Sequence, residues 1–371
     1  MDAGALLRST TVMSAGSPRP LRVGLLGYGL AGRVFHAPLI AATPGLTLAA
    51  VVTRDPERRA ALHAAHPAAD ALDSPEELWA RASSLELVVV ATPNRSHVPL
   101  ARAALDAGLP VVVDKPLAPT ADAARALAAH ACATGHPLTV FQNRRWDGDF
   151  LTVRKLLAAG ALGAIHRFES RFERWAPMPR PGWRERGEPD EAGGVLFDLG
   201  AHLIDQALQL FGPVRAVYAE LDRRRASVVV DDDAFVALAH ASGTRSHLWM
   251  SKLAAQRGPR FRVLGDRAAF TKHGLDGQEP ALAAGGIPGA PGWGDEPPER
   301  WGLLGEGDAA RAIPTEPGGY PRFYEAVAAA LRAGTPMPVN PDDAIAALDI
   351  IEAARRSADL GQTIQLAAPA G

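Results

Sequence analysis

The stretch "VGLLGYGLAGRVFHAPL", residues 23–39, places three glycines in one turn between an apolar run and a helix-like segment. Gly27, Gly29 and Gly32 have the spacing G-x-G-x-x-G. Where such a turn follows a strand and opens a helix, the backbone can approach a pyrophosphate and hold it at the helix N-terminus. Glycine turns also occur in other settings, so the sequence around the turn has to decide its meaning.

The flanking sequence from residue 21 to 141 alternates between short apolar runs and Ala-rich helical segments. The runs are apolar throughout, as in strands that are buried on both faces: "LRVGLL", "LTLAAVV", "LELVVVA", "PVVVD" and "LTVFQ". Strands that alternate with helices predict a parallel, doubly wound sheet. The glycine turn then follows the first strand, so we predict a dinucleotide-binding Rossmann domain over residues 21–141.

The sequence changes character beyond residue 141. Strand-length segments with alternating polarity predict a large, mostly antiparallel sheet: "AIHRFESRFERW", "AVYAEL", "DAFVALAH", "RSHLWMSKL" and "RFRVLG". Two helices are predicted near 319–333 and 342–359, and the Trp residues of a Gly/Pro-rich loop near 277–300 indicate that this loop packs against the protein. We therefore predict an α/β domain followed by an α+β domain over residues 142–371, with residues 1–20 as a flexible tail.

The composition is that of an ordinary globular protein. The chain has 371 residues, of which 47% are hydrophobic, and a formal net charge of −2, which does not favour nucleic acid as a partner. Its only cysteine, Cys132, excludes an intrachain disulfide or a Cys-based zinc site. No apolar stretch has the length of a membrane span and no signal peptide is evident, so we expect a cytoplasmic protein without a membrane partner.

The residues after the second strand predict which dinucleotide binds. A ribose-binding Asp or Glu is expected about 20 residues past the glycines, but the sequence has Thr53 and Arg54 there. Arg54 can pair with a 2′-phosphate and Thr53 can donate its hydroxyl, which favours NADP, with NAD as the alternative cofactor. Asp55 precedes a proline and is predicted to cap the next helix. The competing interpretation is that Arg54 is a solvated loop charge.

Two further segments carry groups suited to chemistry. Lys115 directly follows a predicted strand and so faces the same crevice as the glycine turn. In "GGVLFDLGAHLIDQALQLFG", residues 193–212, a helical projection places one set of polar side chains within about 60° of each other: Asp198, His202, Asp205 and Gln209. Short acids, a histidine and an amide suit the wall of a crevice, although a plain amphipathic helix is the alternative.

These segments together resemble the glucose–fructose oxidoreductase/inositol dehydrogenase (Gfo/Idh/MocA) family. The matching motifs are "GLLGYGLAG", "ATPNRSH", "DKP" and "GGVLFDLGAHLID". The resemblance implies that Lys115 corresponds to the lysine of the family's E-K-P motif, with a cis peptide to Pro116, and that Asp198 and His202 are the catalytic acid and histidine. Asp114 stands where glutamate is commoner. The implied cofactor-binding residues are Gly27, Gly29, Leu30, Ala31, Gly32, Thr53, Arg54, Thr92, Pro93, Asn94, His97, Asp114 and Lys115.

Within the family, "FQNRRWDGDFLTVRKLL", "ESRFERW" and "KHGLDGQEP" resemble the subgroup that contains NADP-dependent scyllo-inositol dehydrogenases. The resemblance implies oxidation of a cyclic polyol or sugar hydroxyl, with His202 as general base and Lys115 on the reacting oxygen. No metal is implied. The other residues predicted to contact substrate or form the pocket wall are Asp198, Asp205, Arg144, Arg145, Trp146 and Asp147. An NAD-dependent glycosidase and a non-catalytic dinucleotide-binding regulator remain alternatives on the same fold.

The second domain also predicts self-association. The resemblance implies an oligomer interface on the open face of the large sheet. The alternating strands carry apolar residues that we assign to this outer face: Val236, Leu238, Leu248 and Met250. Burying that face against a second subunit predicts a homodimer or homotetramer.

Overall fold

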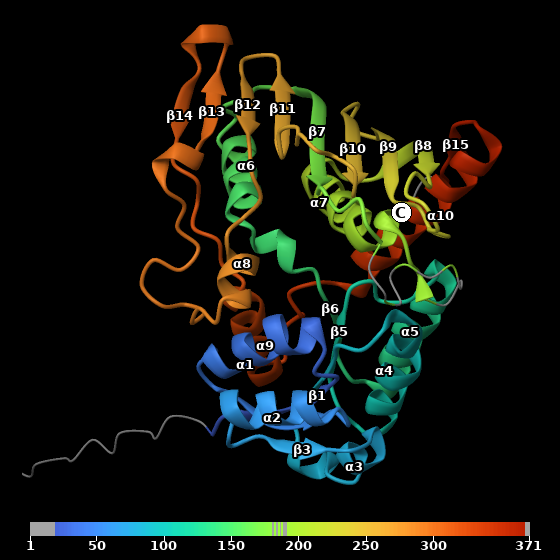
Figure 1. Ribbon diagram of the computed structural model, residues 1–371, viewed down its shortest axis with the longest axis vertical. Helices are drawn as coiled ribbons and strands as arrows, with labels where there is room; N and C mark the ends of the chain where they lie inside the picture. The colour runs from blue at the N-terminus through green and yellow to red at the C-terminus, as the bar shows by residue number, and fades with distance from the viewer. Residues whose placement is uncertain (1–18, 180–181, 183–184, 186, 188–190, 368–371) are drawn as a thin grey trace, which may run out of the picture.

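The computed structural model describes residues 19–179, 182, 185, 187 and 191–367, so the predicted tail, 1–20, lies almost wholly outside the described residues. Within these residues the chain forms two sheets. The parallel sheet lies in the lower part of Figure 1 and the larger, mixed sheet in the upper part. The predicted fold class, a Rossmann domain followed by an α+β domain with a large, mostly antiparallel sheet, is confirmed.

The first sheet has six parallel strands in the order β3-β2-β1-β4-β5-β6. Its strands are β1 Leu21–Leu26, β2 Leu46–Val52, β3 Asp70–Leu72, β4 Leu87–Val90, β5 Val111–Asp114 and β6 Leu138–Phe141. Strands β4 and β5 are almost completely buried, as the unbroken apolar runs predicted. Successive strands are added in one direction from β1 to β3 and in the opposite direction from β4 to β6. Doubly wound sheets bind their ligand at this switch point, next to the carboxyl ends of β1 and β4.

Helices cover the parallel sheet, and three of them begin at a side-chain cap. They are α1 Ala37–Ala42, α2 Pro56–Ala65, α3 Pro75–Trp79, α4 His97–Asp106 and α5 Ala121–Thr134. Asp55 caps α2 by accepting a hydrogen bond from the backbone N–H of Arg58, as predicted. Ser74 and Thr120 cap α3 and α5 in the same way.

The second sheet has nine strands in the order β14-β13-β12-β11-β7-β10-β9-β8-β15. They are β7 Ile165–Glu173, β8 Val214–Asp222, β9 Asp233–His240, β10 Arg245–Ser251, β11 Phe261–Gly265, β12 Ala269–Lys272, β13 Gly302–Gly305, β14 Arg311–Ile313 and β15 Ile364–Gln365. Neighbouring strands are antiparallel except for β7 and β10, which run parallel.

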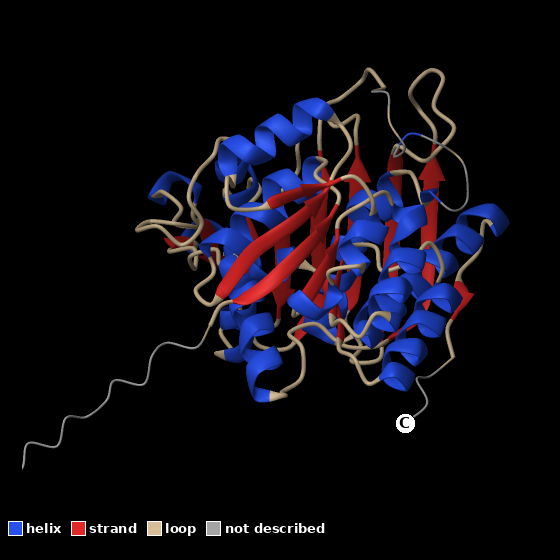
Figure 2. Ribbon diagram, turned by 90° about the horizontal axis from the view of Figure 1, so that it is seen from below, coloured by secondary structure: helices blue, strands red, loops and turns tan. Residues whose placement is uncertain are grey.

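Five further α-helices follow among the described residues. They are α6 Gly148–Ala158, α7 Ala201–Phe211, α8 Gln278–Ala283, α9 Pro321–Ala333 and α10 Pro341–Leu360. Three of them, α8, α9 and α10, contact elements of the first half. Helix α10 packs against β8 and α7 of the second half and against α5 of the first, and α9 packs beside α1 (Figure 1). Figure 2 shows the strands flanked by helices. One continuous hydrophobic cluster therefore runs through both halves.

The predicted facing of the large sheet is wrong. Val236, Leu238, Leu248 and Met250 are at most 1% exposed and point into the chain's own core. The alternating positions, such as Phe235 on β9 and His247 and Trp249 on β10, lie on the other face and are half-buried. The alternating pattern identifies the strands, but a period of two does not say which set of residues meets the core.

Other elements extend the predicted set. The short strands β3 and β12 to β15 were not predicted, because each is only two to four residues long. The loop near 277–300 contains α8, and its tryptophans are anchored as expected: Trp293 Nε1 donates to Gln278 Oε1 and Trp301 Nε1 to the Glu296 carbonyl, both at 3.0 Å. Among the described residues no helix is both long and apolar enough to cross a bilayer.

Candidate active site

The glycine turn has the shape that its spacing predicted. Gly27 has φ +96°, and a Cβ there would lie 2.6 Å from the Ala91 carbonyl oxygen. A Cβ at Gly32 would lie 2.1 Å from the Gly27 carbonyl oxygen, so this helix packs closely onto the turn. At Gly29 the nearest atom is 3.9 Å away on Arg58, which leaves this position open to a ligand.

A cleft of about 620 Å³ lies along the carboxyl ends of these strands. Thr53 and Arg54 line it, together with Arg58 and Ser74, which the sequence analysis did not select. It is also lined by most of the predicted cofactor residues: Gly27, Gly29, Leu30, Ala31, Thr92, Pro93, Asn94, Asp114 and Lys115. An open glycine turn with arginines at one end fits the phosphates of a dinucleotide.

His97 does not line this cleft. The ring is buried, with Nδ1 2.8 Å from the Pro116 carbonyl oxygen and Nε2 2.8 Å from that of Thr92. The His97 ring therefore links the loop after β4 to the loop after β5 through these two backbone carbonyl groups. Gly32 also lies outside the lining and acts through close packing beneath the turn.

Lys115 connects the two halves of the molecule. The Lys115–Pro116 peptide is cis, in agreement with the family resemblance. Lys115 Nζ donates to the carbonyl oxygen of Asp198 at 2.6 Å and lies 3.3 Å from the Asp198 Oδ1 atom. Asp198 belongs to a π-helical turn, Leu196–Gly200, that leads into α7. The Lys115 side chain thus links the end of β5 to the turn that precedes α7.

His202 lies one turn further along the same helix. Its side chain is buried, and its Nδ1 atom has no hydrogen-bond partner among the described residues. Burial lowers the pKa of His202 well below its usual range, and the positive charges of Lys115, Arg144 and Arg260 lower it further. The imidazole is therefore neutral near pH 7 and can accept a proton or a hydrogen bond.

Lys115, Asp198 and His202 line one cavity of about 180 Å³ between the halves. Four residues line both this cavity and the cleft described above: Leu30, Ala31, Asp114 and Lys115. The two spaces therefore meet beside Lys115. A ligand extending along the cleft would reach the predicted catalytic groups at this junction.

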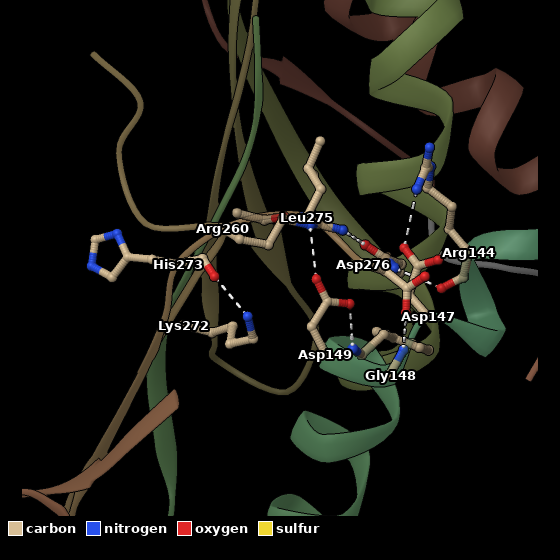
Figure 3. A network of polar contacts seen from close by, with 12 residues as sticks. Arg144, Asp147, Gly148, Asp149, Arg260, Lys272, His273, Leu275 and Asp276 are labelled. Atoms are coloured by element: carbon tan, nitrogen blue, oxygen red, sulfur yellow. Dashed lines mark hydrogen bonds and ion pairs between the residues drawn. The ribbon is translucent and has the colours of Figure 1, made fainter. Parts of the chain in front are cut away.

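Arg144 forms part of the cavity wall and is held by a buried polar network (Figure 3). Its guanidinium contacts Glu279 Oε2 at 2.5 Å and Asp147 Oδ2 at 3.3 Å, and lies 4.6 Å from the centre of the Phe172 ring. The Tyr320 hydroxyl donates to Asp147 at 2.7 Å. Burial raises the pKa of Asp147 well above its usual range, with the Arg144 charge acting in the opposite direction.

Several predicted residues lie outside the cavity lining. Asp205 forms a bidentate ion pair with Arg145, at 2.5 and 2.9 Å, and both side chains are buried. The carboxylate is therefore committed to Arg145 and the predicted contact with substrate is not supported by its position. Trp146 packs edge-on against Phe323, and Gln209 is exposed in a separate groove beside α10.

Other cavity residues were not selected from the sequence: His36, Phe35, Phe141, Asn143, Phe172, Arg174, Leu199 and Glu279. His36 lies within the opening stretch quoted above, where its closeness to the glycine turn was a usable signal. Arg174 and Glu279 lie in "ESRFERW" and "KHGLDGQEP", but nothing in those segments shows that they meet. Their atoms Arg174 Nη2 and Glu279 Oε1 are 3.6 Å apart although the residues are far apart in sequence.

Two family models match the chain. The model described as "Oxidoreductase family, NAD-binding Rossmann fold" matches residues 21–142, and "Oxidoreductase family, C-terminal alpha/beta domain" matches residues 154–366. Together they cover both halves of the structure, and each matches the half that its description would require.

Named relatives are similar over nearly the whole chain. "Uncharacterized oxidoreductase YdgJ" of Escherichia coli is 40% identical, covering 94% of this chain and 99% of that protein. "scyllo-inositol 2-dehydrogenase (NADP(+)) IolW" of Bacillus subtilis is 35% identical, covering 93% and 96%. The solved structure of yvaA from Bacillus subtilis, in triclinic form, is 35% identical with a TM-score of 0.88, covering 94% and 99%.

Proposed function

Because the chain belongs to the Gfo/Idh/MocA oxidoreductase family, we propose that it is an NADP-dependent dehydrogenase of a cyclic polyol or sugar, of the scyllo-inositol kind. One observation carries the proposal: Lys115, Asp198 and His202 line a single cavity that joins the cleft of the glycine turn. The similarity to a relative named as an NADP(+)-dependent scyllo-inositol dehydrogenase supports the substrate class.

The residues of the cleft fit a dinucleotide. The turn at Gly27 to Gly32 would hold the pyrophosphate, and Thr53 and Arg54 would hold the ribose end, where a 2′-phosphate finds a positive charge instead of a carboxylate. Asp114 and Lys115 would lie at the nicotinamide end. When bound, the nicotinamide supplies the hydride acceptor for alcohol oxidation.

The chain's own residues handle the proton. His202 takes the proton of the reacting hydroxyl, since its imidazole is neutral and the residue lines the cavity beside Lys115. Lys115 donates a hydrogen bond to the same oxygen and stabilises its negative charge. Asp198 holds the Lys115 amine through its carbonyl and carboxylate oxygens. Arg144, fixed over Phe172, forms the opposite wall for the other hydroxyls.

The proposal predicts net reduction of the cofactor: the amount of cofactor reduced should exceed the amount of enzyme present. A panel of inositols, aldoses and ketoses, each with NADP⁺ and with NAD⁺, would be followed by absorbance of the reduced cofactor. We expect at least one cyclic polyol or sugar to be oxidised with NADP⁺. Hydrolysis of a glycoside without net reduction would contradict the proposal, and so would tight dinucleotide binding with no reaction.

We also propose that the functional unit is a homodimer or homotetramer formed through the open face of the large sheet. That face carries Phe235, His247 and Trp249 at its centre, with ring centroids 5.1–6.1 Å apart, and Arg171 lies 3.9 Å over the Trp249 ring. Aromatic and arginine side chains are typical of buried interfaces.

A further inference from the structure

His36 is a buried histidine that the proposed mechanism does not use. It ends the helical turn Ala31–His36, which follows the glycine turn, and its side chain is fully buried. The ring lies 4.4 Å from that of Phe141 and 6.2 Å, edge-on, from that of Tyr324 (centroid distances). These ring contacts fix the orientation of the imidazole, which forms part of the cavity wall.

The two ring nitrogens of His36 have different surroundings. Nδ1 lies 2.6 Å from the Tyr324 hydroxyl oxygen. Nε2 has no hydrogen-bond partner among the described residues, and Asp114 Oδ1 lies 4.0 Å away, beyond hydrogen-bond reach. A buried polar atom without a partner costs about 1–3 kcal/mol, so such atoms in native proteins usually meet a ligand or water.

The surroundings also favour one tautomer. The negative charge of the Asp114 carboxylate, 4.0 Å from Nε2, favours an N–H group at this atom over a lone pair. The proton is therefore placed on Nε2, and the Tyr324 hydroxyl donates to Nδ1. Burial lowers the pKa of His36 to about 4, so the ring is neutral at pH 7. Nε2 is thus a neutral hydrogen-bond donor that lacks an acceptor.

The position of His36 indicates which ligand supplies the acceptor. Asp114, its neighbour, lines both the cleft and the cavity, whereas His36 lines only the cavity, just beyond the junction. The end of a dinucleotide that reaches Lys115 from the cleft enters the cavity at this point. In a nicotinamide dinucleotide this end carries a carboxamide, whose carbonyl oxygen is a strong neutral acceptor.

We propose that the Nε2–H group of His36 donates a hydrogen bond to the carboxamide oxygen of the cofactor's nicotinamide, with Tyr324 and Asp114 holding the imidazole in that orientation. This rests on the proposed function in one respect, that a nicotinamide dinucleotide binds in the cleft. The bond would fix the rotation of the nicotinamide ring, and so which ring face meets the substrate.

Two substitutions separate this role from a structural one. In His36→Asn the amide lies near the position of Nδ1, so the contact with Tyr324 can persist while the cavity donor is lost. In His36→Gln the amide nitrogen lies near the position of Nε2, so the cavity donor persists. Calorimetric titration would compare NADPH with 2′-phospho-ADP-ribose, which lacks the nicotinamide but fills the rest of the cleft. NADH and ADP-ribose would be titrated in parallel.

We expect His36→Asn to weaken NADPH binding by about 3- to 10-fold, the usual value of one neutral hydrogen bond, with 2′-phospho-ADP-ribose binding unchanged. His36→Gln should bind both ligands within about 3-fold of the wild type. Equal losses for both ligands in His36→Asn, or no loss for either, would overturn the assignment. Wild-type protein that binds NADPH but oxidises no polyol or sugar would contradict the proposed function and leave the His36 result standing.

Discussion

The Nζ atom of Lys115 lies 2.6 Å from the carbonyl oxygen of Asp198 and donates a hydrogen bond to it, across the boundary between the two halves of the chain. Lys115 follows a strand of the parallel sheet, and Asp198 precedes the helix that carries His202. This contact sets the position of the amine relative to the imidazole. The catalytic predictions below depend on that arrangement.

Replacing His202 with alanine should lower kcat for alcohol oxidation by about 10²- to 10⁴-fold, the usual contribution of a positioned acid–base group. Affinity for the dinucleotide should change little, since its phosphates are expected at the glycine turn. Steady-state kinetics and a binary titration would measure the two effects. His166→Ala, an exposed histidine on β7, is the matched control. Near-normal turnover in His202→Ala would show that His202 is structural.

Lys115→Ala should cost a comparable factor in kcat, because the reacting oxygen would lose its charged donor. Since Lys115 and His202 act on the same oxygen, the double variant should lose less than the product of the two single losses. A double-mutant cycle on kcat/KM tests this. Strictly multiplicative losses would indicate that the two side chains act on different steps.

Arg54→Ala should remove most of the preference for NADP over NAD. A hydrogen bond to a charged group contributes about 1.5–3 kcal/mol, which corresponds to about ten- to over a hundred-fold in affinity. Titrations of the wild type and the variant with both cofactors would measure it, with the exposed Arg154→Ala on α6 as control. Equal affinities of the wild type for NADP and NAD would contradict the prediction.

The folded protein should lose stability as the pH falls from about 6.5 to about 4. Burial, opposed in part by the Asp114 charge, lowers the pKa of His36 from 6.5 to about 4. In this range the unfolded chain binds a proton at His36 that the folded chain does not, so acid favours unfolding by up to roughly 3 kcal/mol from this residue. Urea unfolding across this range should show a shallower pH dependence in His36→Gln. An unchanged dependence would contradict it.

The open face of the large sheet should mediate self-association. Trp249→Glu, at the centre of that face, should convert the oligomer to a monomer, because a buried carboxylate there would have to be desolvated. Light scattering at micromolar concentration measures this. Leu360→Glu, at an exposed apolar residue at the end of α10, should leave the oligomer intact. A monomeric wild-type protein would refute the prediction.

The sequence predicted the parallel sheet well because its signals are local. An unbroken apolar run between glycine turns and Ala-rich helices has few other solutions, and Gly27 and Gly32 have to be glycines for steric reasons that their spacing already indicates. The orientation of the large sheet was harder to predict from the sequence. The alternation at Val236 and Leu238 gave the strand but not the face that meets the core, since that depends on which elements pack against it.

The helix that carries His202 shows a second limit. Gln209 projects in nearly the same direction as His202, but at 1.5 Å per residue it lies about 10 Å further along the axis, beyond the cavity. Asp205 faces Arg145, a partner about 60 residues away that no local pattern reveals. A helical projection gives the direction of a side chain but not its depth, and long-range charge pairs such as Arg144 with Glu279 appear only in three dimensions.

Helix α10 has a consequence for how the protein loses its activity. It packs on α5 of one half and on β8 and α7 of the other, within a single continuous apolar cluster. The two halves are therefore one cooperative unit, and calorimetry should record one melting transition instead of two. Neither half could be excised as an autonomous module. A substitution that weakens the packing anywhere in the molecule, even far from Lys115 and His202, would therefore reduce the fraction of folded, active enzyme.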